Sequence, residues 1–277
     1  MGILTGRVAV VAGASRGVGR GVATGLGEAG ATVYVTGRTV ADDEADVPGT
    51  IDQTAAEVSE LGGRGVAVRC DHRDDSEVEA LFRKVGSDEG RLDVLVNSVW
   101  AGYESLFADG EYIGDLPFWR QPLSRWGDMI DAGVRAAYVA SSFAAPLMIR
   151  AEDGLIVHVS YWAARKHIGT TVYGVAKAAT DKMAADMGHE LREHGVAVVS
   201  LYPGLVRTER VMAAAEFFDL GNSESPRFAG RVVAALAADP DRMRRSGDVL
   251  VAAELAREYG VLDVDGSSPR PLSLADA

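Results

Sequence analysis

Cysteine and lysine are rare in this 277-residue chain. Cys70 is the only cysteine, so no intrachain disulfide is possible, and a lone thiol is compatible with a reducing compartment. We expect Cys70 to be a buried strand residue rather than a nucleophile. Only four lysines stand among 28 basic residues, against 40 acidic ones, and the net charge is −12. This balance argues against general binding to nucleic acid or to anionic membranes.

Targeting and membrane-spanning segments are also lacking. The first residues have neither the basic region nor the long apolar run of a signal peptide. The most apolar long stretch, residues 134–149, contains two serines and a proline and falls short of a membrane span. We predict no metal site. The expectation is a cytoplasmic protein without a membrane segment.

Short apolar runs alternate with helical stretches along the whole chain. We expect strands at residues 7–12, 32–36, 66–70, 93–97, 155–160, 196–201 and 248–251, and helices at 17–29, 51–61, 75–86, 124–149, 171–194 and 227–238. Strands that are apolar throughout are typical of parallel sheets covered on both faces. Their alternation with helices implies right-handed crossovers. The sequence therefore predicts one α/β domain over residues 1–277, a Rossmann-like doubly wound parallel sheet of about seven strands with helices on both faces.

Two stretches interrupt this alternation. Residues 40–50 are acidic and predict a solvated loop. Residues 103–123 hold five aromatic side chains. They fit either core packing under a long loop or the wall of a pocket, and the sequence leaves both open.

Glycines follow the first predicted strand and open the first predicted helix. The run Gly13-Ala14-Ser15-Arg16-Gly17-Val18-Gly19 lets the backbone turn sharply and approach a pyrophosphate, which the amides at the helix N-terminus would bind. This position in a strand–turn–helix unit predicts a dinucleotide site.

Arginines bias the choice of dinucleotide. NAD sites usually place an acidic residue at the end of the second strand, and here that end carries Arg38 and no acid. Arg38 and Arg16 together suit a 2′-phosphate, which favours NADP(H) over NAD(H), although both fit solvated surface arginines too. Asp71 follows the third strand and fits an adenine contact. Asn97 ends the fourth strand, where the sheet order reverses and ligands bind.

Tyr173 and Lys177 are four residues apart in a predicted helix, so they share one face. A nearby cation favours the anionic form of a phenol and lowers its pKa from about 10. Such a tyrosine can exchange a proton with a substrate oxygen at physiological pH.

These motifs, in this order, resemble the short-chain dehydrogenase/reductase family over nearly the whole chain. The matching pieces are Gly13-x-x-x-Gly17-x-Gly19, Asn97, Ser160, Tyr173-x-x-x-Lys177 and Pro203-Gly204-x-x-x-Thr208. Residues 173–186, 189–196 and 255–266 resemble one branch of that family more closely.

The resemblance implies a role for each matched residue. Tyr173 is expected to be the general acid or base, Lys177 to lower its pKa and hold the nicotinamide ribose, and Ser160 to hydrogen-bond the substrate oxygen. Thr208 is expected to bind the carboxamide. The full set of implied cofactor contacts is Gly13, Ser15, Arg16, Gly17, Val18, Gly19, Arg38, Asp71, Asn97, Tyr173, Lys177, Pro203, Gly204, Val206 and Thr208.

One departure from the family pattern concerns Gly133, which stands in a predicted helix where the family usually has Asn. Glycine inside a helix costs about 1 kcal/mol relative to alanine, so a local reason is expected. Our hypothesis is that a water on a backbone carbonyl near Gly133 replaces the amide. Ser98 also replaces the second Asn of the common Asn-Asn pair.

The expected substrate pocket is aromatic. Its walls are Trp100, Tyr103, Trp162 and Met212, beneath a flap near residues 205–226. Aromatic walls suit a bulky apolar ketone or secondary alcohol, and the resemblance together with Arg38 implies an NADP(H)-dependent carbonyl reductase or alcohol dehydrogenase for such a compound. A non-catalytic NADP(H)-binding sensor or scaffold is the alternative, and NAD(H) remains possible. By analogy with the family, we expect a homodimer or homotetramer.

Overall fold

The computed structural model describes residues 2–276 except 42–46, 104–105, 109–110 and 115. All four acidic residues of the predicted loop at 40–50 therefore lie outside the described residues.

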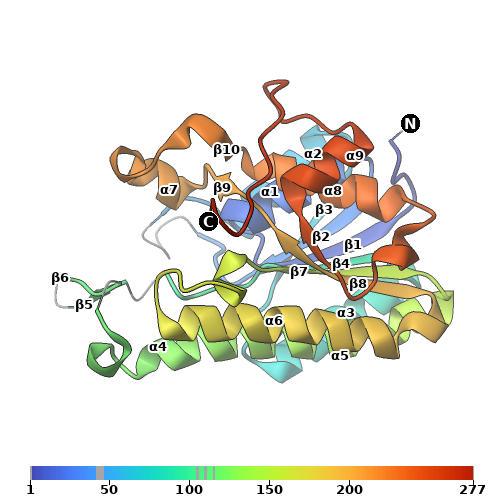
Figure 1. Ribbon diagram of the computed structural model, residues 1–277. Coiled ribbons are helices and arrows are strands. Elements are labelled where there is room, and N and C mark those ends of the chain that lie inside the picture. Colours follow the sequence, from blue (N-terminus) through green and yellow to red (C-terminus); the bar gives the residue numbers. More distant parts are fainter. Residues whose placement is uncertain (1, 42–46, 104–105, 109–110, 115, 277) are drawn as a thin grey trace.

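Seven parallel strands form one sheet in the order β11-β8-β7-β4-β1-β2-β3 (Figure 1). They are β1 (Val8–Ala12), β2 (Thr32–Gly37), β3 (Arg64–Arg69), β4 (Val94–Asn97), β7 (Gly154–Val159), β8 (Val196–Tyr202) and β11 (Val249–Val251). The chain runs outward from β1 in both directions, to β2 and β3 on one side and to β4 on the other. The predicted α/β fold is confirmed, and the reversal of strand order lies between β1 and β4.

Cys70 directly follows β3 instead of ending it, so the predicted strand was two residues late at its start and one residue late at its end. The thiol is buried, and burial raises its pKa to about 12. A thiol that stays protonated at neutral pH is a poor nucleophile.

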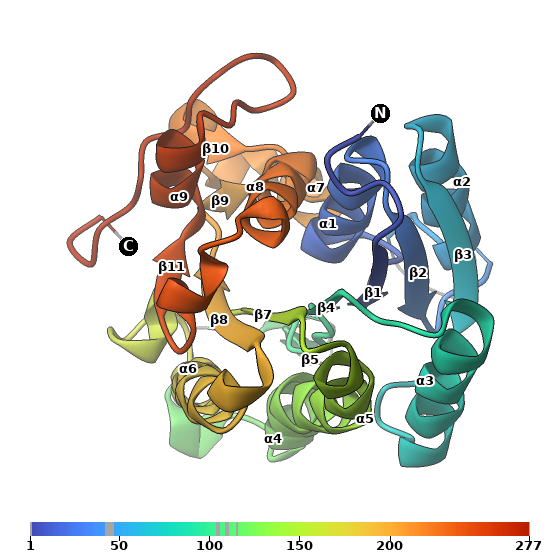
Figure 2. The ribbon, with the colours of Figure 1, turned by 90° about the vertical axis from the view of Figure 1, so that its right-hand side faces the viewer.

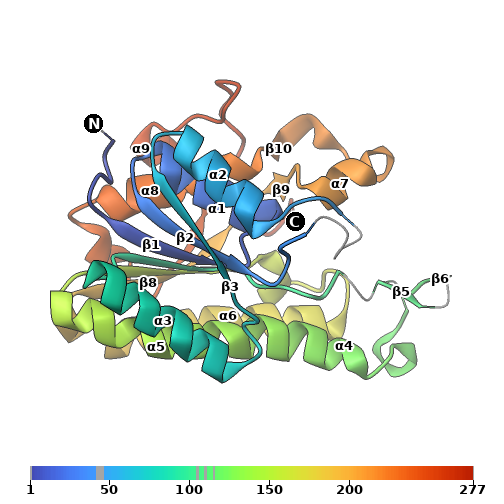
Figure 3. The same cartoon turned by 180° about the vertical axis from the view of Figure 1, so that it is seen from behind.

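Helices cover both faces of the sheet (Figures 2 and 3). On one face lie α1 (Gly17–Glu28), α2 (Ile51–Glu60), α8 (Pro226–Ala238) and α9 (Ala252–Tyr259); on the other lie α3 (Asp75–Glu89), α5 (Ala136–Ala151) and α6 (Thr171–Glu190). Side chains of β1 alternate between two cores, with Ala9 and Val11 facing α1 and α8, and Val8 and Val10 facing α3 and α5. This burial on both faces explains why the strands read as continuous apolar runs.

Glycines bring α1 and α8 into backbone contact. A Cβ on Gly21 would lie 2.0 Å from the backbone of Pro226, and one on Gly230 would lie 2.3 Å from the carbonyl oxygen of Gly21. No larger residue fits at either position unless the two helices separate. The N-terminal and C-terminal parts of the chain are therefore packed directly on each other.

The predicted helix at 124–149 has an unexpected segment. It consists of α4 (Ser124–Trp126), the π-helix η3 (Gly127–Arg135) and α5. Length and composition alone would let Ser124–Ala151 cross a membrane, but half of its most apolar window is buried against the rest of the chain. That burial accounts for the apolar composition of this helix.

The aromatic stretch at 103–123 projects from the carboxyl edge of the sheet. It carries a short hairpin, β5 (Phe107–Ala108) and β6 (Glu111–Tyr112), and the 3-10 turn η2 (Phe118–Arg120). Phe118 and Trp119 are 65% and 72% exposed, so the core-packing alternative is wrong for these two side chains.

Small elements make up the segment predicted as a flap. They are β9 (Leu205–Val206), α7 (Glu209–Ala213), the 3-10 turns η6 (Ala215–Phe217) and η7 (Leu220–Asn222), and β10 (Ser223–Glu224). They lie at the same edge of the sheet as the β5–β6 hairpin (Figure 1).

Candidate active site

The glycine loop between β1 and α1 is shaped for close approach. Gly13 and Gly17 have φ values of +77° and +59°, in the left-handed region that favours glycine. A Cβ on Gly13 would lie 2.8 Å from the backbone of Ser98 and Val99, and one on Gly19 would lie 2.0 Å from the carbonyl oxygen of Gly13. Larger residues cannot replace Gly13 or Gly19 without displacing the backbone.

The start of α1 already binds an anionic side chain. The backbone amide of Gly17 donates to Oε2 of Glu209 at 2.8 Å, and Glu209 belongs to α7 in the flap segment. A carboxylate on this amide indicates that the loop suits a negative group, as the phosphates of a dinucleotide would require. No sequence motif marks Glu209, because its approach to Gly17 depends on how the segment after β8 folds back.

Arg38 directly follows β2, and Arg16 lies in the glycine loop. Arg16 donates to the carbonyl oxygen of Gly49 at 2.8 Å and to Oγ1 of Thr39 at 3.3 Å. Arg38 is exposed, and its charge contributes to lowering the pKa of Asp71. Arg38 and Asp71 therefore lie close enough to interact, at the ends of neighbouring strands.

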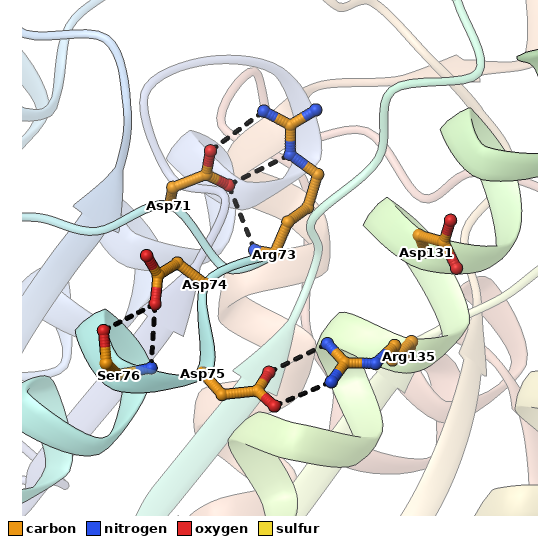
Figure 4. Close-up of a pocket in the computed structure, with 7 residues that line it drawn as sticks. All are labelled: Asp71, Arg73, Asp74, Asp75, Ser76, Asp131 and Arg135. Carbon is orange, nitrogen blue, oxygen red and sulfur yellow. Dashed lines mark hydrogen bonds and ion pairs between the residues drawn. The ribbon is translucent and has the colours of Figure 1, made fainter.

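Asp71 borders a hollow of about 740 Å³ (Figure 4). Its carboxylate accepts hydrogen bonds from the backbone amide, Nε and Nη2 of Arg73 at 3.0, 3.1 and 2.9 Å. Hydrogen bonds from Arg73 hold the pKa of Asp71 down at about 2. On the other side of the hollow, Arg135 of η3 forms two hydrogen bonds with Asp75 at the start of α3. An adenine contact at Asp71 would share its oxygens with Arg73.

Asn97 points its amide into the layer below the sheet. Its Nδ2 donates to Oγ of Ser141 at 3.1 Å and lies 3.3 Å from Nδ1 of His158. Asn97 and His158 are buried, and burial lowers the pKa of His158 to about 4. The side chain of Asn97 therefore joins β4 to β7 and α5 beneath the site.

Tyr173 and Lys177 share one face of α6, as predicted. Thr170 caps this helix, since its Oγ1 accepts from the Tyr173 amide at 3.3 Å. Lys177 is 8% exposed, and its Nζ donates to the carbonyl oxygen of Val159 at 3.1 Å. The same Nζ lies 4.3 Å from the ring centroid of Trp100 and 5.8 Å from that of Tyr173. Burial lowers the pKa of Lys177 to about 8.

The pKa of Tyr173 departs from the prediction. Burial raises it well above the ordinary phenol value, and the neighbouring Tyr103 and Tyr161 raise it further. The expected lowering by Lys177 is not seen in this arrangement: burial is the largest cause of the raised pKa, and the Lys177 ammonium lies 5.8 Å from the ring centroid. Tyr173 is therefore protonated at neutral pH.

Ser160 directly follows β7 and is 2% exposed. Its Oγ donates to the carbonyl oxygen of Lys177 at 3.3 Å. The hydroxyl is thus next to α6 and engaged with the helix backbone. To donate to a substrate oxygen, this hydroxyl would have to give up its hydrogen bond to the Lys177 carbonyl.

Three of the four predicted pocket residues contact other aromatic side chains. The ring centroid of Trp100 lies 5.5 Å from Tyr173 and 6.3 Å from Tyr103. Trp162 instead packs against Tyr202 of β8, with centroids 5.2 Å apart. Met212 lies on α7 and is 48% exposed. The structure thus brings Trp100 into ring contact with both Tyr103 and Tyr173, whereas Trp162 packs on Tyr202.

The segment after β8 reaches back to the glycine loop. The side chain of Thr208 lies beside Gly17, and its Oγ1 caps α7 by accepting from the Val211 amide at 3.3 Å.

Below Gly204, the carboxyl of Glu224 accepts from the Gly204 amide and is 1% exposed. Burial raises the pKa of Glu224 to about 8. No motif in the sequence singled out Glu224.

The chain matches known proteins over most of its length. Residues 7–217 match the family model of the short chain dehydrogenases. Dehydrogenase/reductase SDR family member 1 of Mus musculus is 45% identical over 280 residues, which cover 95% of this chain and 85% of that protein. This is the branch that residues 173–186, 189–196 and 255–266 resemble. The 7alpha-hydroxysteroid dehydrogenase of Escherichia coli is 30% identical over 207 residues, covering 74% of this chain and 73% of that protein.

Solved structures agree with the sequence matches. A short chain dehydrogenase from Mycobacterium thermoresistibile superposes with a TM-score of 0.80 at 25% identity, covering 98% of this chain and 93% of that one. A 7 alpha-hydroxysteroid dehydrogenase complexed with NADH and 7-oxo glycochenodeoxycholic acid superposes with a TM-score of 0.73 at 25% identity, covering 96% of each chain.

Proposed function

Because this chain belongs to the short-chain dehydrogenase family and is thus an oxidoreductase of alcohol and carbonyl groups, we propose that it reduces a bulky apolar ketone with NADPH, or oxidises the matching secondary alcohol. The observation that carries this proposal is the shared face of Tyr173 and Lys177 on α6, beside Trp100.

The glycine loop fits a dinucleotide because Gly13 and Gly19 leave no room for a Cβ and the Gly17 amide already donates to an anionic partner. The bound dinucleotide supplies or accepts the hydride at the carbonyl carbon. In the reductive direction, Tyr173 donates its hydroxyl proton to the carbonyl oxygen, which becomes an alcohol. The phenol carries its proton at neutral pH, as a proton donor must, although a raised pKa by itself makes it a weaker acid. Lys177 holds the ribose, and Ser160 hydrogen-bonds the reacting oxygen.

A bulky ketone is supported by the aromatic side chains around Tyr173 and by one relative. The structure of the 7 alpha-hydroxysteroid dehydrogenase contains a 7-oxo bile acid, a large alicyclic ketone. That structure also contains NADH, so NAD(H) is the alternative cofactor for this chain.

The first test is NADPH oxidation with a panel of bulky ketones and quinones. We expect turnover, and we expect Tyr173→Phe to lower it by at least about a hundredfold, because the proton donor is lost. NADPH binding, measured by fluorescence titration, should stay within about twofold, since α6 keeps its cap and Lys177 remains.

Tyr138→Phe is the matched control, because Tyr138 is 57% exposed on α5. It should leave turnover unchanged. NADPH binding without turnover of any compound would support the non-catalytic sensor or scaffold instead.

The proposed preference for NADP(H) rests on Arg38. We expect Arg38→Ala to weaken NADPH binding by at least about tenfold, because a charge-assisted hydrogen bond to the 2′-phosphate is lost. NADH has no such phosphate and should bind as before. Arg69→Ala is the control, since Arg69 is exposed and pairs with Glu77. Equal losses for both dinucleotides would contradict the preference.

Three wider statements belong to the same proposal. They are one domain over residues 1–277 with a substrate flap near 205–226, a cytoplasmic location, and a homodimer or homotetramer. Light scattering on the purified protein tests the assembly, and cell fractionation tests the location. A monomer or a membrane-bound fraction would contradict them.

A further inference from the structure

Trp100 fills the space next to two glycines. A Cβ on Gly133 would lie 2.9 Å from Cζ3 of the Trp100 indole, and one on Gly102 would lie 2.7 Å from its Cζ2. Gly133 lies in the π-helix η3, and Gly102 follows Trp100 in the chain. The ring is therefore held between two backbone segments that have no side chains to displace it.

The indole presents its face to the ammonium of Lys177. Nζ lies 4.3 Å from the ring centroid and donates one hydrogen bond, to the carbonyl oxygen of Val159. Lys177 is 8% exposed, and a cation over an indole face gains most where water is excluded. The edge of the same ring system contacts Tyr173 at an interplanar angle of 65°.

Hydrogen bonding by the indole nitrogen does not explain why a tryptophan stands at position 100. Its Nε1 is buried and has no hydrogen-bond partner among the described residues. A phenylalanine would fill apolar space without leaving an N–H unpaired. The larger, more electron-rich face of indole is what tryptophan adds here, since it is the best aromatic partner for a cation.

We propose that Trp100 is a positioning residue that holds the Lys177 ammonium through its ring face, and that Gly133 is required because any side chain there would displace the indole. This inference rests on the proposed function, in which Lys177 binds the ribose. It also gives Gly133 a local reason other than a bound water, since the indole covers the position of its absent side chain.

The first test needs no cofactor or substrate, and it uses the scarcity of lysine. Protein labelled with ¹³C at the lysine ε-carbon gives four signals, from Lys84, Lys166, Lys177 and Lys182. We expect one set of ε-protons to be shifted upfield by the indole ring current, and that signal to disappear in Lys177→Arg. If this variant does not fold, arginine substitutions of the other three lysines assign the signal by elimination.

Substitutions of Trp100 then separate its ring face from its volume. Trp100→Leu should move the Lys177 signal to the position of an exposed lysine, whereas Trp100→Phe should retain part of the upfield shift. Gly133→Ala should also remove the shift, because its Cβ would collide with the indole. In the Trp100→Leu background, Gly133→Ala should change nothing further.

Activity provides the second test. With a ketone that the protein turns over, Trp100→Leu should lower kcat and weaken NADPH binding by about tenfold each, and Trp100→Phe should restore most of both. An unshifted Lys177 signal, or a leucine variant as active as the phenylalanine variant, would overturn the proposal. Absence of turnover in the unmodified protein would contradict the proposed function, whereas the NMR result would still decide the position of Trp100.

Discussion

Glu224 is a buried carboxyl group that no sequence motif marks. It lies under Gly204 at 1% exposure, and its Oε1 has no hydrogen-bond partner among the described residues. Burial is the largest cause that raises its pKa, to about 8 from 4.5, and the nearby Asp263 adds to it. The folded state therefore prefers the neutral acid.

A pH dependence of stability follows from this shift. Because the folded pKa is raised, the stabilisation by the proton is complete below pH 4.5 and is lost as the pH rises through about 8. We expect Glu224→Gln to gain stability relative to the unmodified protein from about pH 5 to pH 8, reaching on the order of 2 kcal/mol. Thermal melts between pH 5 and 9 measure it.

Glu216→Gln is the control for this comparison, because Glu216 is an exposed acid in the same segment. It should show no such trend. A constant difference between Glu224→Gln and the unmodified protein across the pH range would contradict the raised pKa.

Single residues were predictable where a motif placed them and not where burial decided their chemistry. The four-residue spacing of Tyr173 and Lys177 was sufficient to place both on one face of α6. The direction of the pKa shift of Tyr173 was not predictable, because it depends on how completely the folded chain excludes water from the phenol. Glu224 has no sequence signal at all, since only the folded segment brings it under Gly204.

Helix α7 is linked to the glycine loop by Glu209. Its carboxylate accepts from the Gly17 amide at 2.8 Å and lies 3.7 Å from the guanidinium of Arg20. A dinucleotide phosphate at this amide must displace the carboxylate, and the two negative groups repel each other. Glu209 therefore competes with the cofactor.

We expect Glu209→Gln to tighten NADPH binding by about three- to tenfold, because a neutral amide is a weaker competitor for the amide hydrogen. Fluorescence titration at fixed ionic strength measures the change, with Glu216→Gln as the control for loss of one acid from the same segment. Weaker binding in Glu209→Gln would mean that Glu209 helps to hold the cofactor.

Long elements were predictable and short ones were not. The seven strands and six helices expected from apolar periodicity are present, because burial on one face or two imposes a pattern over many residues. The helix α9, the π-helix η3, the β5–β6 hairpin, α7 and β9–β10 were missed. Most of these elements have two to five residues, too few for a periodic pattern, and in η3 the indole of Trp100 lies against Gly133.

An ion-pair network closes the amino edge of the sheet, opposite the candidate active site. Asp93, whose side chain is 5% exposed, accepts from the Val8 amide and from Arg7, both at 2.7 Å. Arg7 also pairs with Asp153 at 2.6 Å, and Asp153 pairs with Arg242. The network thus joins segments at both ends of the chain and near its middle.

Acid should weaken this network. Burial alone would raise the pKa of Asp93, but hydrogen bonds from Arg91, Arg7 and Val8 outweigh it, and the pKa is lowered. A lowered folded pKa contributes stability above the ordinary value of 3.8, and this is lost as the pH falls through the folded pKa. We expect Asp93→Asn to cost about 2–3 kcal/mol at pH 7, and less below about pH 4.

Urea unfolding at pH 7 and pH 3.5 measures this difference. Asp241→Asn is the control, since Asp241 is 64% exposed and pairs only loosely with Arg244 at 3.4 Å. It should change stability by less than about 0.5 kcal/mol. An Asp93→Asn cost that is equal at both pH values would contradict the lowered pKa.

The glycine contact between α1 and α8 bears on how the chain folds during synthesis. Gly21 and Gly230 are more than two hundred positions apart in the sequence. The backbones of α1 and α8 nevertheless lie so close together at these glycines that a single methyl group does not fit between them. While the ribosome is still adding residues before Pro226, α1 has no partner for its glycine face, so the dinucleotide loop that it carries is incompletely supported. The cofactor site is therefore finished late in translation, and a nascent chain truncated before α8 should hold the dinucleotide weakly.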